Sequence, residues 1–188
     1  MNTLYPIFLK TDQLRILIVG GGSVALEKLQ FLFKSSPNAK VSLLAPLFKE
    51  STLEFVKNKE VELINNNYNI SYLKDYQIVV ATTDKTEVNK EIYRDCRANN
   101  ILVNVADNPP LCDFYMGSIV TKGDLKIAIS TNGKSPTLAK RLRQWLEAVL
   151  PDEIDNLLDN LQQYRDSLKM DFDSKVKALN KITKDLLP

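Results

Sequence analysis

The sequence predicts an α/β fold: a Rossmann-like parallel sheet, followed by a small β-rich segment and a helical C-terminal region. Three observations lead to this prediction. Strand-like apolar runs alternate with helix-like segments over the first part of the chain. The glycine-rich stretch GGGSVA, residues 20–25, joins the first such run to the first helix. After Pro110 two β-like runs flank a short turn, and the rest of the chain has helical periodicity.

Each element of the parallel part follows from its local pattern. Buried parallel strands have apolar runs, which the sequence shows at LRILIVG (14–20), KVSLLAP (40–46), VELIN (61–65), QIVVATT (77–83) and ILVNVAD (101–107). Helices are expected over 23–34, 48–58 and 85–99. The alternation of strands and helices predicts a parallel sheet with right-handed crossovers. The carboxyl ends of its strands then meet at one edge, where ligands bind in such folds.

The later part of the chain has a different pattern. A hairpin is expected within 113–131, turning at residues 122–124, which read Lys-Gly-Asp. A helix then begins at Pro136, where the side chain of Ser135 can cap it. Two short charged helices are expected over 152–187.

Composition excludes several classes of protein. The net charge of +2 gives no reason to expect a nucleic-acid partner. No apolar run reaches the roughly 18 residues that a membrane span needs. The two cysteines form no CxxC motif, which fits a reducing, cytoplasmic location. The chain has no histidine, so we expect no metal site, and proton transfer must use a carboxylate, Lys, Tyr or Cys.

The glycine-rich turn has the spacing Gly20-x-Gly22-x-x-Ala25, between a strand and a helix. In a dinucleotide site the first glycine makes the turn, the second admits the pyrophosphate, and the small third residue lets helix and strand pack closely. The alternative is a plain structural turn. The acidic residue that usually binds the ribose is missing, since Ala45 and Pro46 stand there and no Arg replaces it. The sequence therefore favours NAD over NADP.

Two further strand ends carry candidate residues. Thr82 and Thr83 end the fourth strand, where small side chains can pass close to a dinucleotide, although Thr83 can also cap the next helix. Asp107 ends the fifth strand and is a candidate general base, because the chain has no histidine. The alternative for Asp107 is a turn residue ahead of two prolines.

A candidate anion site precedes the helix that begins at Pro136. Lys134 and the helix-start N–H groups at Ser135 would suit a substrate with several carboxylates, and Arg141 lies on the basic face of the same helix. The alternative is an ordinary capped helix with a solvated basic face.

Taken together, the motifs resemble one family, the precorrin-2 dehydrogenases, which also form the N-terminal module of sirohaem synthases. The resemblance covers about residues 3–150. The matching stretches are LYPIFL (4–9), ILIVGGGSVALEKLQFL (16–32), VVATTD (79–84), ILVNVADNPPLCDF (101–114) and GDLKIAISTNGKSPTLAKRLR (123–143).

The resemblance implies NAD-dependent oxidation of precorrin-2 to sirohydrochlorin by a homodimer, with Asp107 as the catalytic carboxylate. It implies the cofactor-binding residues Gly20, Gly22, Ser23, Val24, Pro46 and Leu47, to which the strand-end argument adds Thr82 and Thr83. It divides the chain into an NAD-binding Rossmann domain (1–110), a β-rich dimerisation segment (111–134) and a helical region (135–188).

Two questions stay open at this point. Some family members also insert Fe²⁺ as a second substrate, and the sequence does not decide that ferrochelatase activity. We expect a protein other than the complete trifunctional sirohaem synthase, because no methyltransferase domain lies within these residues. The alternative function is a non-catalytic NAD-sensing module. It would explain the glycines but gives no reason for NVADNPP at 104–110 or NGKSP at 132–136.

Overall fold

The structure is a computed structural model that describes residues 2–184. The contacts within the chain divide it into two compact units. The first holds the chain up to Gly117 together with Asn132–Lys134, and the second holds Ser118–Thr131 and the chain from Ser135 onward. The three-part division expected from the sequence, with boundaries at 110 and 134, stays a prediction.

The first unit is built on a five-stranded parallel sheet with the order β3-β2-β1-β4-β5. The strands are β1 (Arg15–Val19), β2 (Lys40–Ala45), β3 (Val61–Asn65), β4 (Ile78–Ala81) and β5 (Leu102–Val105). The helices are α1 (Ser23–Ser35), α2 (Glu50–Val56) and α3 (Thr86–Ala98), with short 3₁₀ segments at Ile70–Leu73 and Pro109–Leu111. The predicted Rossmann-like sheet is confirmed.

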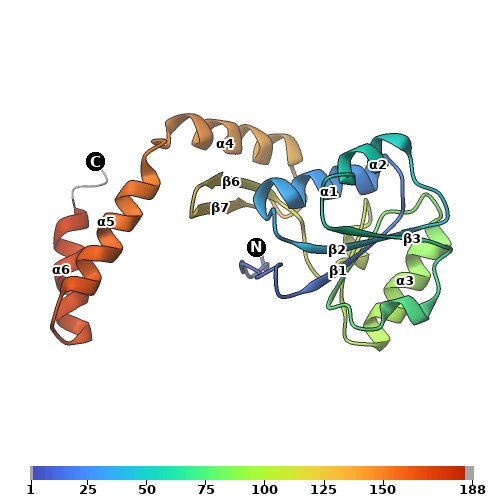
Figure 1. Cartoon of the computed structure of the whole chain (residues 1–188), viewed down its shortest axis with the longest axis horizontal. Coiled ribbons are helices and arrows are strands. Elements are labelled where there is room, and N and C mark those ends of the chain that lie inside the picture. The colour runs from blue at the N-terminus through green and yellow to red at the C-terminus, as the bar shows by residue number, and fades with distance from the viewer. Residues whose placement is uncertain (1, 185–188) are drawn as a thin grey trace. The chain divides into compact units, whose positions relative to one another are not determined.

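Apolar side chains cover both faces of this sheet. On one face α1 and α2 pack through Ala25, Leu29 and Val56 against the even-numbered side chains of β1, such as Ile18. On the other face α3 packs through Ile92 and Cys96 against the odd-numbered side chains. Figure 1 shows α1 and α2 on one side of the strands and α3 on the other. Burial on both faces explains why the strands are continuous apolar runs.

The strand register brings the strand ends to one edge of the sheet. Val19, the last residue of β1, pairs with Leu44 of β2 and with Ala81 of β4, and Ala81 in turn pairs with Val105 of β5. The chain leaves β1 for β2 on one side and returns as β4 on the other. This reversal is the topological switch point at which open α/β sheets bind ligands.

The second unit consists of a hairpin and three helices. The hairpin pairs β6 (Ser118–Lys122) with β7 (Leu125–Ile129), and the helices are α4 (Pro136–Val149), α5 (Ile154–Ser167) and α6 (Phe172–Thr183). Lys122 Nζ donates to the Leu150 carbonyl at 2.9 Å and pairs with Asp152. Asp155 Oδ1 accepts from the Asp124 N–H at 2.9 Å. These bonds tie the hairpin turn to the start of α5. Among the described helices, none is long and apolar enough to cross a membrane.

Candidate functional site

Gly20, which follows β1, has a conformation and a neighbour that exclude any side chain. Its φ of 131° lies in a region that L-residues rarely adopt. A Cβ on Gly20 would overlap both the hydroxyl and the carbonyl of Thr82. Thr82 is buried, and its Oγ1 donates to the Val19 carbonyl at 2.9 Å. The loops that follow β1 and β4 are therefore in direct contact, so two of the predicted cofactor residues lie side by side.

Gly21 serves a purpose that the sequence motif did not show. A Cβ at this position would overlap the Leu47 carbonyl and press on Phe48. The Gly21 carbonyl accepts from the Lys49 N–H at 2.9 Å and from Thr52 Oγ1 at 3.2 Å. The middle glycine therefore lets the segment after β2, and with it the start of α2, dock onto the turn.

The space beside Gly22 is empty, unlike the space beside Gly20 and Gly21. Gly22 forms the N-cap of α1 with ordinary extended backbone angles, and no atom lies within 4 Å of a Cβ built on it. No side chain caps α1, and its first turn holds no acidic residue. The helix N–H groups and the partial positive charge of the helix N-terminus therefore face space that an anion can enter. This geometry fits the pyrophosphate of a dinucleotide.

The other predicted cofactor residues lie at the start of α1 and in the segment after β2, which contacts the turn at Gly21. Ser23, the first residue of α1, is exposed and accepts a hydrogen bond from Lys49 Nζ at 2.8 Å. Val24, the next residue, is half-buried. Pro46 and Leu47 follow β2, and the Leu47 side chain is 81% exposed.

Thr83 is held by the helix that follows it. Its hydroxyl donates to Asn89 Oδ1 at 2.7 Å, and the Asn89 amide donates back to the Thr83 carbonyl at 2.9 Å. The Lys85 N–H donates to the same hydroxyl at 3.3 Å. Thr83 therefore fixes the loop that leads into α3, but it is not the helix cap that the alternative expected, because the N-cap of α3 is Lys85 and no side chain caps this helix.

Asp107 lies in the turn directly after β5. It is exposed, and its φ of 58° places its backbone in the left-handed region, which Asp and Asn tolerate better than most residues. The N–H of Ala106 donates to the Ala81 carbonyl at 2.9 Å, which ties this turn to the end of β4. The predicted carboxylate therefore stands at the same edge of the sheet as the glycine turn.

Cys112 supports the Asp107 turn, a role that its sequence position alone does not reveal. Its Sγ accepts from the Val105 N–H at 3.3 Å and lies within donor distance of the Val105 carbonyl, at 3.2 Å, and of the Asn108 carbonyl, at 3.3 Å. Burial raises the pKa of this thiol, which keeps its proton available for donation. The thiol thereby bonds the outer edge of β5, where a further strand would otherwise pair.

Asp113, the residue after Cys112, also forms hydrogen bonds with the outer edge of β5. Its N–H donates to the Val103 carbonyl at 2.8 Å, and its Oδ2 accepts from the Val103 N–H at 3.0 Å. Its Oδ1 also accepts from Arg97 of α3 at 2.7 Å. These bonds hold the segment after the turn alongside β5.

Of the three predicted substrate residues, Lys134 and Ser135 precede α4 and Arg141 lies within it. Lys134 is exposed and follows two left-handed residues, Asn132 and Gly133. Ser135 caps α4, since its Oγ accepts from the Leu138 N–H at 3.2 Å. Arg141 is exposed and donates to Gln144 at 3.2 Å. Lys134 belongs to the first unit, and Ser135 and Arg141 belong to the second.

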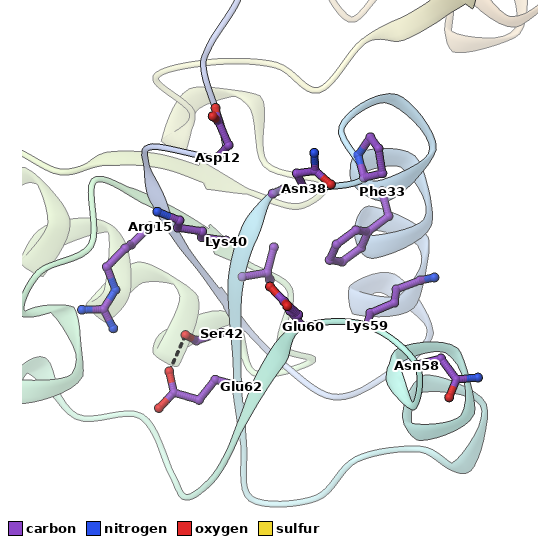
Figure 2. A pocket seen from close by; sticks show the side chains of 13 residues that line it. Asp12, Arg15, Phe33, Asn38, Lys40, Ser42, Asn58, Lys59, Glu60 and Glu62 are labelled. Atoms are coloured by element: carbon purple, nitrogen blue, oxygen red, sulfur yellow. Dashed lines mark hydrogen bonds between the residues drawn. The ribbon is translucent and has the colours of Figure 1, made fainter.

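A groove of about 730 Å³ opens elsewhere on the first unit, beside the amino ends of β1 and β2. Figure 2 shows Arg15, Lys40 and Glu60 among the residues that line it, and the bond from Ser42 to Glu62. Its lining mixes acidic and basic side chains and includes none of the predicted site residues. Because it lies at the strand ends opposite to the glycine turn, it is separate from the candidate site.

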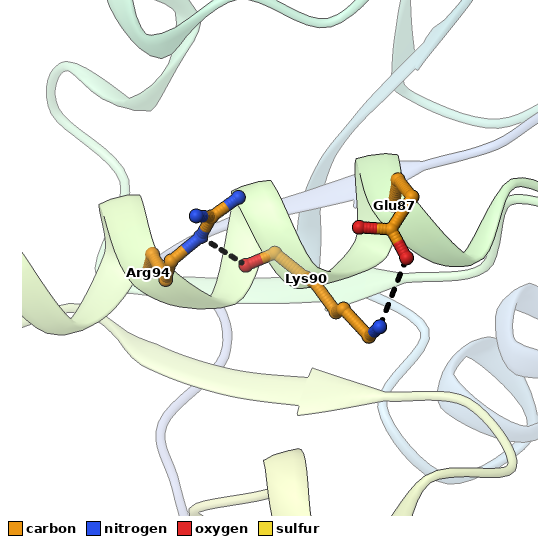
Figure 3. Close-up of polar contacts among 3 residues, drawn as sticks. All are labelled: Glu87, Lys90 and Arg94. Atoms are coloured by element: carbon orange, nitrogen blue, oxygen red, sulfur yellow. Dashed lines mark hydrogen bonds and ion pairs between the residues drawn. The ribbon is translucent and has the colours of Figure 1, made fainter.

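The outer face of α3 carries an exposed ion pair and a side-chain bond to the backbone. Figure 3 shows Lys90 donating to Glu87 at 2.9 Å and Arg94 donating to the Lys90 carbonyl at 3.3 Å. The hydrogen bond from Lys90 lowers the pKa of the Glu87 carboxyl. Such exposed pairs contribute little to stability.

Within residues 2–184 no cluster of acidic and cysteine side chains could hold a metal ion.

A glycine turn at the switch point of a parallel sheet, open over a helix N-terminus, defines a Rossmann-type dinucleotide-binding protein. The model of the family described as "Putative NAD(P)-binding" matches residues 7–118, which is more than half of the chain. The chain therefore belongs to this NAD(P)-binding family. A second model, described as "Sirohaem biosynthesis protein central", matches residues 122–148.

Similar proteins agree with the predicted resemblance. The siroheme synthase of Pseudoalteromonas translucida is 39% identical over 167 residues, which cover 89% of this chain and 35% of that protein. The siroheme synthase of Psychrobacter cryohalolentis is 39% identical over 169 residues, covering 90% of this chain and 32% of that protein. The chain thus spans about a third of the length of the curated relatives it matches.

A solved structure shares the fold. SirC, a precorrin-2 dehydrogenase, superimposes with a TM-score of 0.77, covering 95% of this chain and 89% of that one, at 22% identity. The chain thus shares its fold with a solved structure.

Proposed function

We propose that this chain is an NAD-dependent precorrin-2 dehydrogenase, which oxidises precorrin-2 to sirohydrochlorin in sirohaem biosynthesis. The observation that carries the proposal is a single sheet edge that combines an open dinucleotide turn at Gly22 with an exposed carboxylate at Asp107. The siroheme synthase relatives and the match over 122–148 support a tetrapyrrole substrate.

The proposed chemistry divides between cofactor and chain. When bound, NAD⁺ supplies the hydride acceptor. The balance of the reaction requires precorrin-2 to lose one proton with the hydride, giving sirohydrochlorin, NADH and H⁺. The Asp107 carboxylate accepts that proton, because it stands at the ligand-binding edge and the chain has no histidine to do so. The glycine turn holds the pyrophosphate, and Leu47 contacts the adenosine half.

The cofactor in this proposal is NAD. The side chains at the end of β2 and just after it, Ala45, Pro46 and Leu47, carry no charge for a ribose 2′-phosphate. The substrate carboxylates are assigned to Lys134, to Arg141 and to the capped start of α4 at Ser135. Accepting the Leu138 N–H leaves Ser135 its own hydroxyl proton to donate.

We also propose that the protein acts as a homodimer in the cytoplasm. Leu138, Leu142, Trp145 and Val149 share one face of α4 and are all exposed in the single chain, which supports burial against a second copy. Both cysteines are free, and Cys96 is buried, which supports a reducing compartment.

The test is an anaerobic incubation with precorrin-2 and NAD⁺, followed by Fe²⁺, with absorbance spectra at each stage. We expect NADH and sirohydrochlorin to form together. NAD⁺ binding without NADH formation would overturn the proposal in favour of a sensing module. The iron stage measures the second activity, because sirohaem that forms faster with the protein than without it would add ferrochelatase activity.

A further inference from the structure

Lys49 belongs to none of the residue sets predicted from the sequence, yet its side chain reaches the glycine turn. Its Nζ donates to Oγ of Ser23 at 2.8 Å. Its backbone N–H donates to the Gly21 carbonyl at 2.9 Å. The residue is thus fixed to the turn through both its main chain and its side chain, and its ammonium is held at the first residue of α1.

The surroundings of this ammonium favour an anion. The first turn of α1 contains no acidic residue. Its N-cap is Gly22, so no capping side chain accepts hydrogen bonds from the first N–H groups of the helix. The Lys49 side chain is exposed, and the group to which it donates, the Ser23 hydroxyl, carries no charge. A phosphate next to Gly22 would therefore meet the helix N–H groups and a full positive charge at once.

The bond to Lys49 also sets the direction of the Ser23 hydroxyl. An ammonium can only donate, so the Ser23 oxygen acts as the acceptor in this pair. The hydroxyl proton of Ser23 then points away from Lys49 and can be donated to a phosphate oxygen. Lys49 thus both supplies charge and orients a second donor.

We propose that Lys49 is a pyrophosphate-binding residue of the dinucleotide site, acting through its own ammonium and through Ser23. The proposal rests on the NAD binding proposed above. The sequence motif of the glycine turn ends within α1. The proposal adds Lys49, from the loop after β2, to the residues of that motif that bind the dinucleotide.

The experiment is titration calorimetry of the full chain with NAD⁺ and with NADP⁺. Lys49→Met keeps the length of the side chain and removes its charge, and we expect it to weaken binding of both dinucleotides about tenfold. Lys49→Arg, which keeps the charge, should stay within about threefold of the parent. Lys74→Met removes an exposed lysine elsewhere in the same unit and should change nothing. The salt dependence of NAD⁺ binding should also become shallower in Lys49→Met.

Three results would overturn the inference. Affinities for Lys49→Met within about twofold of the parent would exclude phosphate binding by this side chain. A loss confined to NADP⁺ would move Lys49 to the ribose 2′-phosphate. A parent protein that binds neither dinucleotide would overturn the proposed function itself, whereas a parent that binds both and an unaffected Lys49→Met would overturn only the role of Lys49.

Discussion

At Asp107 the backbone and the carboxylate can be tested separately. The φ of 58° is left-handed, and Asn tolerates this region nearly as well as Asp, whereas Ala does not. Asp107→Asn should therefore keep the turn and the NAD⁺ affinity but lower turnover at least about 100-fold, since it removes the proton acceptor. Anaerobic NADH formation and calorimetry measure the two effects. Turnover close to the parent value in Asp107→Asn would exclude Asp107 as the base.

Cys112 gives a second prediction at the residue scale. Cys112→Ala removes the acceptor of the Val105 N–H, a group on a residue that is 2% exposed. We expect unfolding to become easier by about 1–3 kcal/mol, the cost of a buried unpaired polar group. Because Asp107 lies between these two residues, turnover should fall while NAD⁺ affinity stays unchanged.

Cys112→Ser is the matched control for this prediction. A hydroxyl both donates and accepts, so it should recover part of the stability and of the turnover. Urea denaturation of both variants provides the measurement. An alanine variant as stable as the parent would show that the thiol does not support the turn.

At the scale of the first strand–turn–helix element, two glycines in one turn should respond in opposite ways. Gly20→Ala forces a side chain into a positive φ and into Thr82, and should destabilise the fold by at least about 2 kcal/mol. Gly22→Ala fills open space with an ordinary backbone conformation, so stability should hold while NAD⁺ affinity falls. Thermal unfolding and calorimetry on both variants test the pair. Equal affinity losses without any loss of stability would contradict these assignments.

The elements themselves were largely predictable from the sequence, because burial on both sheet faces leaves continuous apolar runs. Four expected strands ran one to two residues past the observed ends at Val19, Ala45, Ala81 and Val105, whereas the expected strand 61–65 matches β3. The reasons for Gly21, Lys49 and Cys112 were not predictable. Each depends on a partner brought close only by the fold: Leu47, Ser23 and Val105.

At the scale of the whole molecule, the two units bury very different amounts of apolar surface. The first unit covers both faces of its sheet with helices and loops. In the second unit only Val120 and Ala139 are buried apolar residues among those described, and α5 and α6 bury none. A two-stranded hairpin with so little covered surface is marginal alone. The second unit therefore needs a further surface to pack against, as the proposed dimer would provide.

The α4 stripe of Leu138, Leu142, Trp145 and Val149 provides the test of that dimer. These residues recur at helical spacing, and Trp145 is 60% exposed. Trp145→Lys places a charge within the stripe and should convert a dimer into a monomer, because an unpaired charge is costly in an apolar interface. Lys140→Glu, on the opposite side of the same helix, should leave the dimer intact. Sedimentation velocity distinguishes the two states, and a Trp145→Lys protein with the mass of the parent would place any dimer contact elsewhere.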